Sequence, residues 1–187
     1  KFSLRRQFPS IADDELEFHV VRCTGLRVQQ GHKSVKAVVS VEFPYPTAGQ
    51  SATTPMVQST DPEFNFETKF KIDRGKTTFE RIMQTRKLTV NVSNQSDLWF
   101  GRVQVDAFGT AQVKLDTLTT KCEIREKLDL VDSRRKAIGA HVEVIVRLRR
   151  PLKTEYETFG YSNSNYIVIH EPSYQQPYVP PAPAPAP

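Results

Sequence analysis

Residues 58–72 read Q-S-T-D-P-E-F-N-F-E-T-K-F-K-I. Pro62 fixes its own φ angle and disfavours helical backbone at Asp61, so the stretch opens with a turn. Alternation follows, and the residues on one side of the extended chain are Phe64, Phe66, Thr68, Phe70 and Ile72. The other side carries Asn65, Glu67, Lys69 and Lys71. A period of two predicts a strand with one face in a core and one in water. We interpret it as the central strand of an all-β sandwich.

Similar patterns on either side of this stretch predict seven more strands. They cover residues 15–23, 35–43, 51–57, 87–92, 108–115, 124–131 and 140–148. Only residues 79–85 show a convincing helical pattern, with Phe79, Ile82 and Met83 at helical spacing. Eight strands and one short helix predict an eight-stranded antiparallel β-sandwich of two aligned sheets.

The chain divides into four predicted segments. Residues 1–14 are a leader with room for an added edge strand, and residues 15–152 form the sandwich domain. Residues 153–171 are a C-terminal extension, whose apolar run 166–169 offers an additional strand to pack on the sandwich. Residues 172–187 alternate Pro and Ala at their end and predict a disordered, Pro-rich tail.

Composition narrows the class of protein. The net charge of +5 is concentrated in residues 1–150, because the remainder holds three glutamates against Lys153. A basic domain favours anionic partners, either lipid headgroups or nucleic acid, although a mildly basic soluble domain has the same composition. Cys23 and Cys122 form no metal-binding spacing, and we interpret them as reduced, core-packed thiols. No apolar run reaches the 18 or so residues that a membrane span needs.

Six short runs occur in an order that resembles a known family. They are V-E-F-P-Y-P (41–46), T-D-P-E-F (60–64), F-E-R-I-M-Q-T (79–85), F-G-T-A-Q-V-K-L-D (108–116), C-E-I-R-E (122–126) and V-R-L-R-R-P-L (146–152). Together they are similar to the C2 region of the lethal giant discs family, also called coiled-coil and C2 domain-containing protein 1. The resemblance covers about residues 1–171.

This resemblance implies a C2 module of a cytosolic regulator of ESCRT-III, active in endosomal sorting and Notch receptor trafficking. In the family, repeats outside the C2 region bind the ESCRT-III subunit, so that contact is expected elsewhere in the full-length protein. The expected location is the cytoplasm, with peripheral association with the endosomal membrane. In the predicted order residues 58–72 form the fourth strand and residues 139–148 the last. In a C2 domain that order corresponds to the second, circularly permuted topology (type II).

The loops predict no calcium site. Calcium requires six to eight oxygen ligands, several of them carboxylates from converging loops. The loop after the first predicted strand has no acid, and Gln29, Gln30, His32 and Lys33 occupy it. Residues 93–107, which we interpret as a second loop, offer only Asp97 and Asp106. We therefore expect neither a metal nor another cofactor.

Nothing in the sequence indicates an enzyme. The chain has no phosphate-binding glycine loop, no paired-acid arrangement and no nucleophile and histidine in a recognisable setting. His19 and His141 lie in predicted strands, and we interpret both as structural residues.

Two groups of residues are candidates for binding anionic phospholipids. The first comprises outward-facing lysines of two predicted strands and the preceding loop, Lys33, Lys36, Lys69 and Lys71. In many C2 domains lysines on the corresponding face contact phosphoinositides, but a solvated strand face fits the same pattern. The second group is Leu98, Trp99 and Phe100 with Arg102, in the loop that C2 domains direct at the bilayer. The alternative is that these apolar residues fold back as a cap on the sandwich.

Other interpretations of the binding surface remain open. Residues 134–136 form a further basic cluster in a loop. A C2 sandwich without calcium ligands also suits a protein-interaction or scaffold module. A DNA-binding role is the weakest alternative, because no recognition helix or aromatic–basic pattern supports it.

Overall fold

A computed structural model describes residues 8–153 of the chain. These residues form nine strands, one α-helix and two short 3₁₀ helices. The strands are β1 (Glu15–Thr24), β2 (Lys36–Phe43), β3 (Gln50–Thr53), β4 (Val57–Gln58), β5 (Glu63–Lys71), β6 (Lys87–Asp97), β7 (Val103–Lys114), β8 (Glu123–Val131) and β9 (Ala137–Leu148). The helices are α1 (Thr77–Thr85), η1 (Trp99–Gly101) and η2 (Asp116–Thr119).

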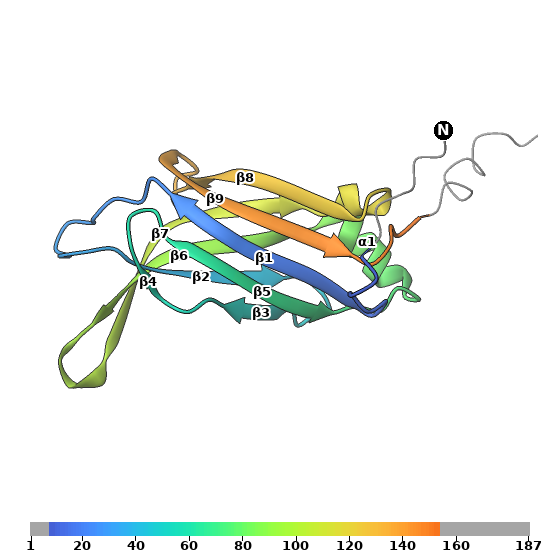
Figure 1. Cartoon of the computed structure of the whole chain (residues 1–187), viewed down its shortest axis with the longest axis horizontal. Helices are drawn as coiled ribbons and strands as arrows, with labels where there is room; N and C mark the ends of the chain where they lie inside the picture. Colours follow the sequence, from blue (N-terminus) through green and yellow to red (C-terminus); the bar gives the residue numbers. More distant parts are fainter. Residues whose placement is uncertain (1–7, 154–187) are drawn as a thin grey trace, which may run out of the picture.

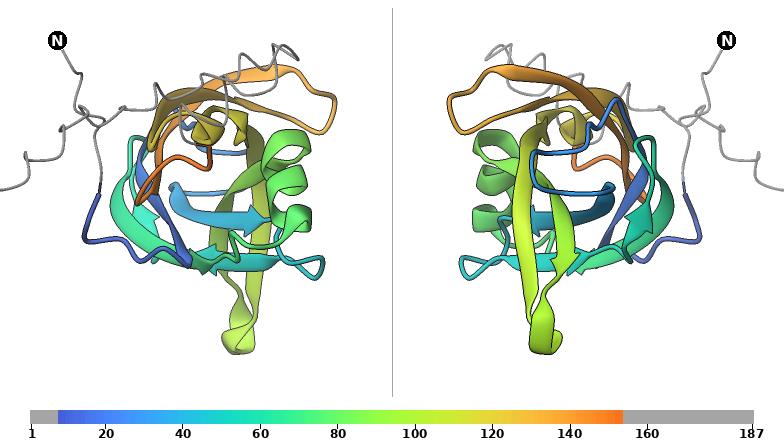
Figure 2. Two further views of the ribbon diagram at one scale, coloured as in Figure 1. Left: turned by 90° about the vertical axis from the view of Figure 1, so that its right-hand side faces the viewer. Right: turned by 90° about the vertical axis from the view of Figure 1, so that its left-hand side faces the viewer.

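Eight of the strands form two four-stranded antiparallel layers, β3-β2-β6-β7 and β8-β9-β1-β5, and the short β4 pairs with β2 (Figures 1 and 2). A single residue pair, Thr110 with Val131, joins β7 to β8 and makes one continuous path of both layers. The last strand, β9, lies between β8 and β1. The predicted antiparallel sandwich and its permuted strand order are therefore confirmed.

Two strand predictions need correction. The predicted strand 51–57 is two strands, β3 and β4, because Pro55 has no N–H for the ladder. Thr54, just before it, bonds to Val39 through its own N–H and through its hydroxyl, which accepts from the Val39 N–H. The predicted loop 93–107 is mostly a hairpin, since β6 continues to Asp97 and β7 begins at Val103. Polar and apolar residues mix there, so no hydrophobic alternation marked these strands.

The predicted signature strand, β5, is an edge strand, and the prediction that it is central was wrong. Among the described residues it pairs with β1 alone, and β1 lies between β5 and β9. Phe70 is 2% exposed and its ring stacks on Phe43 with centroids 5.2 Å apart. Phe64 and Phe66 are only half-buried, as expected near the open edge of a sheet. The alternation itself is confirmed, because the polar residues of β5, Asn65, Glu67, Lys69 and Lys71, face outward.

Both ends of the described chain pack against this framework. Before β1, Ile11 is fully buried and the Phe8 N–H donates to the Arg149 carbonyl, and residues 8–14 add no strand. Helix α1 buries Phe79 and Met83 at the end of the sandwich remote from the β6–β7 hairpin (Figure 1). Among residues 8–153 no helix has the length and apolar character needed to cross a membrane.

Both cysteines are buried thiols and are not joined by a disulfide, as the sequence predicts. Burial raises the pKa of the Cys23 thiol to about 12. The predicted leader before residue 8, the extension beyond residue 153, its run 166–169 and the tail 172–187 lie outside the described residues.

Phe70→Ala should lower the free energy of unfolding by about 3–5 kcal/mol, because it leaves a cavity beside Phe43. Urea denaturation followed by circular dichroism measures the change. Lys69→Ala, at the neighbouring outward position, serves as the control and should cost less than about 1 kcal/mol. Equal losses at the two positions would show that β5 is not half-buried as described.

Candidate functional site at the hairpin end

One end of the sandwich carries the candidate site, which we call the hairpin end. It consists of loop 25–35, loop 59–62 and the tip of the β6–β7 hairpin, residues 98–102. The hairpin extends well beyond the body of the sandwich (Figures 1 and 2). Loop 25–35 is fastened to its base, because the Gln29 side-chain amide donates to the Ala107 carbonyl over 3.0 Å.

The hairpin tip holds an apolar side chain in full contact with solvent. Phe100 is 98% exposed, and its backbone has a left-handed φ of 66°. Gly101 follows with φ of 71°, and the Leu98 N–H donates to the Arg102 carbonyl to close the turn. Leu98 is 45% exposed and Arg102 is exposed beside them. The side chain of Trp99 lies outside what the structure describes. Phe100 therefore does not cap the sandwich.

The carboxylates at the hairpin end are already paired. Asp97 forms an ion pair with Lys36 at 2.9 Å. Asp106 lies 3.0 Å from His32 Nε2 and also accepts from Gln104, while His32 Nδ1 lies 2.8 Å from the Ser96 hydroxyl. Asp61, which the sequence analysis placed only in a turn, accepts a 2.7 Å hydrogen bond from the Gly25 N–H. Each acid thus binds a separate protein donor.

The structure separates the four predicted lysines into two pairs. Lys33 is exposed at the hairpin end, with Lys36 nearby. Strand β5 begins after loop 59–62 at that end and carries Lys69 and Lys71 away from it, since Lys71 pairs with Glu15 at the start of β1. The extended strand covers about 3.3 Å per residue, so the two pairs lie at opposite ends of the sandwich.

Lys69 and Lys71 are engaged by acids. Lys69 lies 3.3 Å from Glu15, and Lys71 lies 3.1 Å from Glu15 and 3.4 Å from Asp14. The hydrogen bonds to Glu15 and Asp14 raise the pKa of the Lys71 ammonium. By contrast, Lys33 and Arg102 have no ion pair among the described residues. Of the residues predicted to bind lipid, Lys33 and Arg102 at the hairpin end are therefore available to an anionic partner, whereas Lys69 and Lys71 are held by acids.

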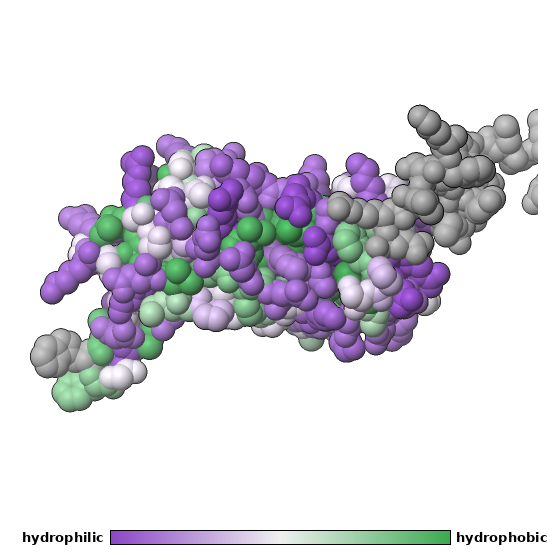
Figure 3. Space-filling model, in the orientation of Figure 1, coloured by the Kyte–Doolittle hydropathy of each residue, from purple (hydrophilic) through white to green (hydrophobic). Residues whose placement is uncertain are grey.

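Sequence reasoning missed two residues of this end, Arg27 and Val28. Both are exposed in loop 25–35, and Val28 is 49% exposed. The run L-R-V, a basic residue between two apolar ones within a loop, was the available signal. The surface is mostly hydrophilic over the sheet that faces the viewer, whereas the end of the hairpin is hydrophobic (Figure 3).

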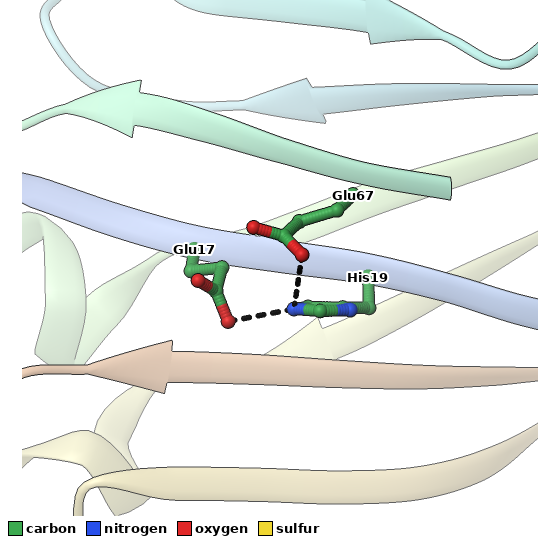
Figure 4. A group of neighbouring side chains, drawn as sticks. All are labelled: Glu17, His19 and Glu67. Atoms are coloured by element: carbon green, nitrogen blue, oxygen red, sulfur yellow. Dashed lines mark hydrogen bonds and ion pairs between the residues drawn. The ribbon is translucent and has the colours of Figure 1, made fainter. Parts of the chain in front are cut away.

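A second group of polar residues lies on the outer face of β1 and β5, where Glu17 and Glu67 point toward His19 (Figure 4). His19 Nε2 is 2.6 Å from Glu17 and 3.6 Å from Glu67, close enough for the three to hold a cation. Arg147 also reaches Glu17 at 3.4 Å, and Lys69 pairs with Glu17 in the register of the two strands. Because positive charge already flanks Glu17 on both sides, we assign the group a structural role, as predicted for His19.

The comparisons with known proteins agree with this geometry. The sequence model for the first C2 domain of RPGR-interacting protein 1 matches residues 48–151. Human coiled-coil and C2 domain-containing protein 1A is 33% identical over 82% of the chain. The chain is a C2 domain of the coiled-coil and C2 domain-containing protein 1 family. It spans only 16% of that human relative and 17% of the Xenopus laevis 1B protein, which is 34% identical over 79% of the chain.

Solved structures support the same assignment. A structure of CC2D1B, a protein described as coordinating ESCRT-III activity during mitotic reformation of the nuclear envelope, has a TM-score of 0.72 and 31% identity. The match covers 82% of this chain and 64% of the CC2D1B chain. A C2 domain of plant extended synaptotagmin 1 has a TM-score of 0.58 at 20% identity, covering 80% of this chain and 100% of its own. That second similarity shows the fold alone.

Glu17→Gln should destabilise the C2 domain in a pH-dependent way. Burial raises the pKa of the Glu17 carboxyl, but hydrogen bonds and charge from His19 and Arg147 outweigh it, leaving a pKa below the ordinary 4.5. A lowered pKa stabilises the native state above the ordinary value, and this contribution is lost as pH falls through the lowered pKa. The variant should lose about 1–3 kcal/mol near pH 7 and much less at strongly acidic pH.

Urea denaturation at several pH values measures this difference. Glu126→Gln, an exposed position on β8, is the matched control and should show a small change at every pH. A loss at Glu17 that is the same at pH 7 and in acid would contradict the assigned ion pairs.

Proposed function

We propose that this C2 domain binds anionic phospholipid membranes without calcium, through its hairpin end. The observation that carries the proposal is the exposure of Phe100 on a projecting hairpin beside Arg102. The function is that of a binding module and involves no catalysis. A membrane can bind an exposed apolar side chain and the basic side chains around it at the same time, through its hydrocarbon region and its anionic headgroups.

The energetics suit weak, peripheral binding. Moving a phenylalanine ring from water into an apolar phase contributes about 1.5–3 kcal/mol. Each basic residue close to an anionic surface adds about 1 kcal/mol, and Arg27, Lys33 and Arg102 are exposed at this end. Trp99 is adjacent in sequence, and tryptophan favours the membrane–water interface. Lys69 and Lys71, remote and paired with acids, contribute little in this orientation.

The partners of the acids support the proposed independence from calcium. Asp97, Asp106 and Asp61 each bind a separate protein donor, and loops 25–35 and 98–102 contain no other carboxylate. A calcium ion would have to displace Lys36 and His32 to gain two carboxylates, fewer than its usual ligand set provides.

The cellular context is a further part of the proposal. As the C2 part of a CC2D1-type protein, the domain would bring an ESCRT-III regulator from the cytoplasm to the endosomal membrane, where Notch receptors are sorted. Contacts with ESCRT-III subunits would be made by other regions of the full-length protein. The alternative is a docking module for another protein, because an exposed phenylalanine also fits a protein groove. Nucleic acid is a poor partner, since Lys36, Lys69 and Lys71 on the sheet faces are already paired with acids.

Phe100→Ser should weaken binding to anionic vesicles roughly tenfold or more, as expected from the loss of about 1.5 kcal/mol of apolar transfer. Arg102→Ala should weaken it about fivefold, consistent with about 1 kcal/mol. Co-sedimentation with phosphatidylserine-containing and purely phosphatidylcholine vesicles measures both effects. The emission of Trp99, which is the sole tryptophan, should shift to the blue on the anionic vesicles.

The paired substitution Lys69→Ala with Lys71→Ala is the control and should leave vesicle binding within about twofold, as screened surface ion pairs contribute little. If this pair abolished binding while Phe100→Ser did not, the lysine face of β5 would be the membrane contact. No retention of the unaltered chain on anionic vesicles would favour the docking alternative.

Millimolar calcium should change neither vesicle retention nor the melting temperature, because a ligand stabilises only a native state that has a site for it. Differential scanning fluorimetry with calcium or with a chelator provides the measurement. A rise of several degrees that disappears in Asp106→Asn would show that calcium displaces His32.

A further inference from the structure

The two layers separate along the side of the sandwich where β7 meets β8. These strands pair only at Thr110 and Val131, and in the described chain neither has another strand partner on its facing edge. Beyond that pair, residues 111–114 of β7 and 123–130 of β8 present unpaired edges toward each other. An unpaired strand edge offers its N–H and C=O groups to any extended chain that reaches it.

A cleft of about 540 Å³ lies where the two strands part. Thr110 and Gln112 line it from β7, and Asp129 lines it from β8. Lys87 at the start of β6 and Arg135 in the β8–β9 turn also contribute to its walls. Because β7 and β8 belong to different layers, an occupant of this cleft would contact both layers.

Lysines form a row across the same side of the molecule. Lys87 of β6 lies directly opposite Lys114 of β7, and both are exposed. The register of Thr110 with Val131, continued along the diverging strands, brings Lys127 of β8 to the level of Lys114. Like charges opposite each other on neighbouring strands destabilise a sheet, so stability of the fold does not account for this row.

The acids around the cleft do not neutralise these lysines. Each of the following accepts a hydrogen bond or forms an ion pair with another part of the protein: Glu42, Asp116, Glu123, Asp129, Asp132 and Glu143. Glu126 is the exception, and it lies on the inward side of β8, as the buried Ile124 does. Lys87, Lys114 and Lys127 have no side-chain partner in the described part of the chain. The unpaired charge on the outward side of the cleft is therefore positive.

We infer that this cleft binds an extended, acidic segment of a partner protein, which adds as a strand between β7 and β8. The backbone of the segment would satisfy the unpaired edges, and acidic side chains at alternate positions would lie between Lys114 and Lys127. The intervening side chains would point inward, where Leu128 is only half-buried. A lipid headgroup can use the lysines but not the strand edges, so the two observations together favour a peptide.

This inference goes beyond the proposed membrane contact and does not depend on it. Thr110 lies about 23 Å along β7 from Val103, the first residue of the strand at the hairpin. The unpaired edge of β7 is short, about 13 Å at 3.3 Å per residue. Binding should therefore be weak, and it should weaken further as salt screens the lysines.

Fluorescence anisotropy of labelled synthetic peptides, measured with the 187-residue chain and without lipid, tests the inference. The probe is a short peptide of alternating Glu and Val, and the same peptide with Lys in place of Glu is the charge control. The acidic peptide should bind and the basic peptide should not. Methylating alternate backbone nitrogens of the acidic peptide removes N–H donors from one of its edges. At least one of the two methylated registers should bind about tenfold more weakly, as expected from the loss of hydrogen bonds.

The variant Lys114→Gln with Lys127→Gln should weaken binding of the acidic peptide about tenfold, because it removes both facing charges. Its melting temperature should be no lower than that of the unaltered chain, since the Lys87–Lys114 repulsion is relieved. Thr53→Glu with Gln58→Glu changes the net charge equally at exposed positions of β3 and β4. This control should bind the acidic peptide within about twofold of the unaltered chain, because salt screens distant charges.

Equal binding of the acidic peptide and both methylated forms would overturn strand addition. An equal loss in the lysine variant and in the control variant would also overturn the inference, because it would indicate general attraction to a basic protein. If the lysine variant lost retention on phosphatidylserine vesicles but bound the acidic peptide as before, the lysine row would be a lipid contact instead.

Discussion

The pairing of β1 on both of its edges is the constraint on which the sandwich depends. Strand β1 bonds to β9 on one side and to β5 on the other, and it buries Leu16, Phe18 and Val20 completely. The two sheets share only the Thr110–Val131 pair, so the apolar core holds them together far more than the backbone ladder does. Because the inward residues of β1 are fixed, its outward residues Glu17 and His19 are fixed as well, and they organise the ion pairs of that face.

Charge is distributed unevenly over the surface of this domain. On the β8-β9-β1-β5 face Arg147 is paired with Glu17 and Glu123, and Lys69 and Lys71 are held by acids at the start of β1. The β3-β2-β6-β7 face is uncharged in its central rows, and Glu42, Lys87 and Lys114 lie toward one end of it. Free basic residues and the exposed Phe100 remain together at the hairpin end.

Several features could be predicted from residues 58–72 and the runs around them. Phe70 and Ile72 alternate with Lys69 and Lys71, and this period of two held in the structure because inward and outward positions on a strand are set by local geometry. The absence of acids in loop 25–35 could also be recognised from the sequence, because it depends on composition alone. The hairpin formed by the adjoining ends of β6 and β7 could not be predicted, because Ser93, Gln95 and Val105 give no hydrophobic alternation. These residues are held in place by pairing between the two strands.

By itself the sequence determined the class of fold, the family and the inward or outward direction of most strand residues, because those depend on neighbours along the chain. Only the tertiary structure decided which strand is central, that Lys36 and Lys69 lie at opposite ends, and that Asp106 is paired with His32. These facts depend on contacts between residues far apart in sequence, such as Arg147 and Glu17, and alternation within a strand carries no information about its partner.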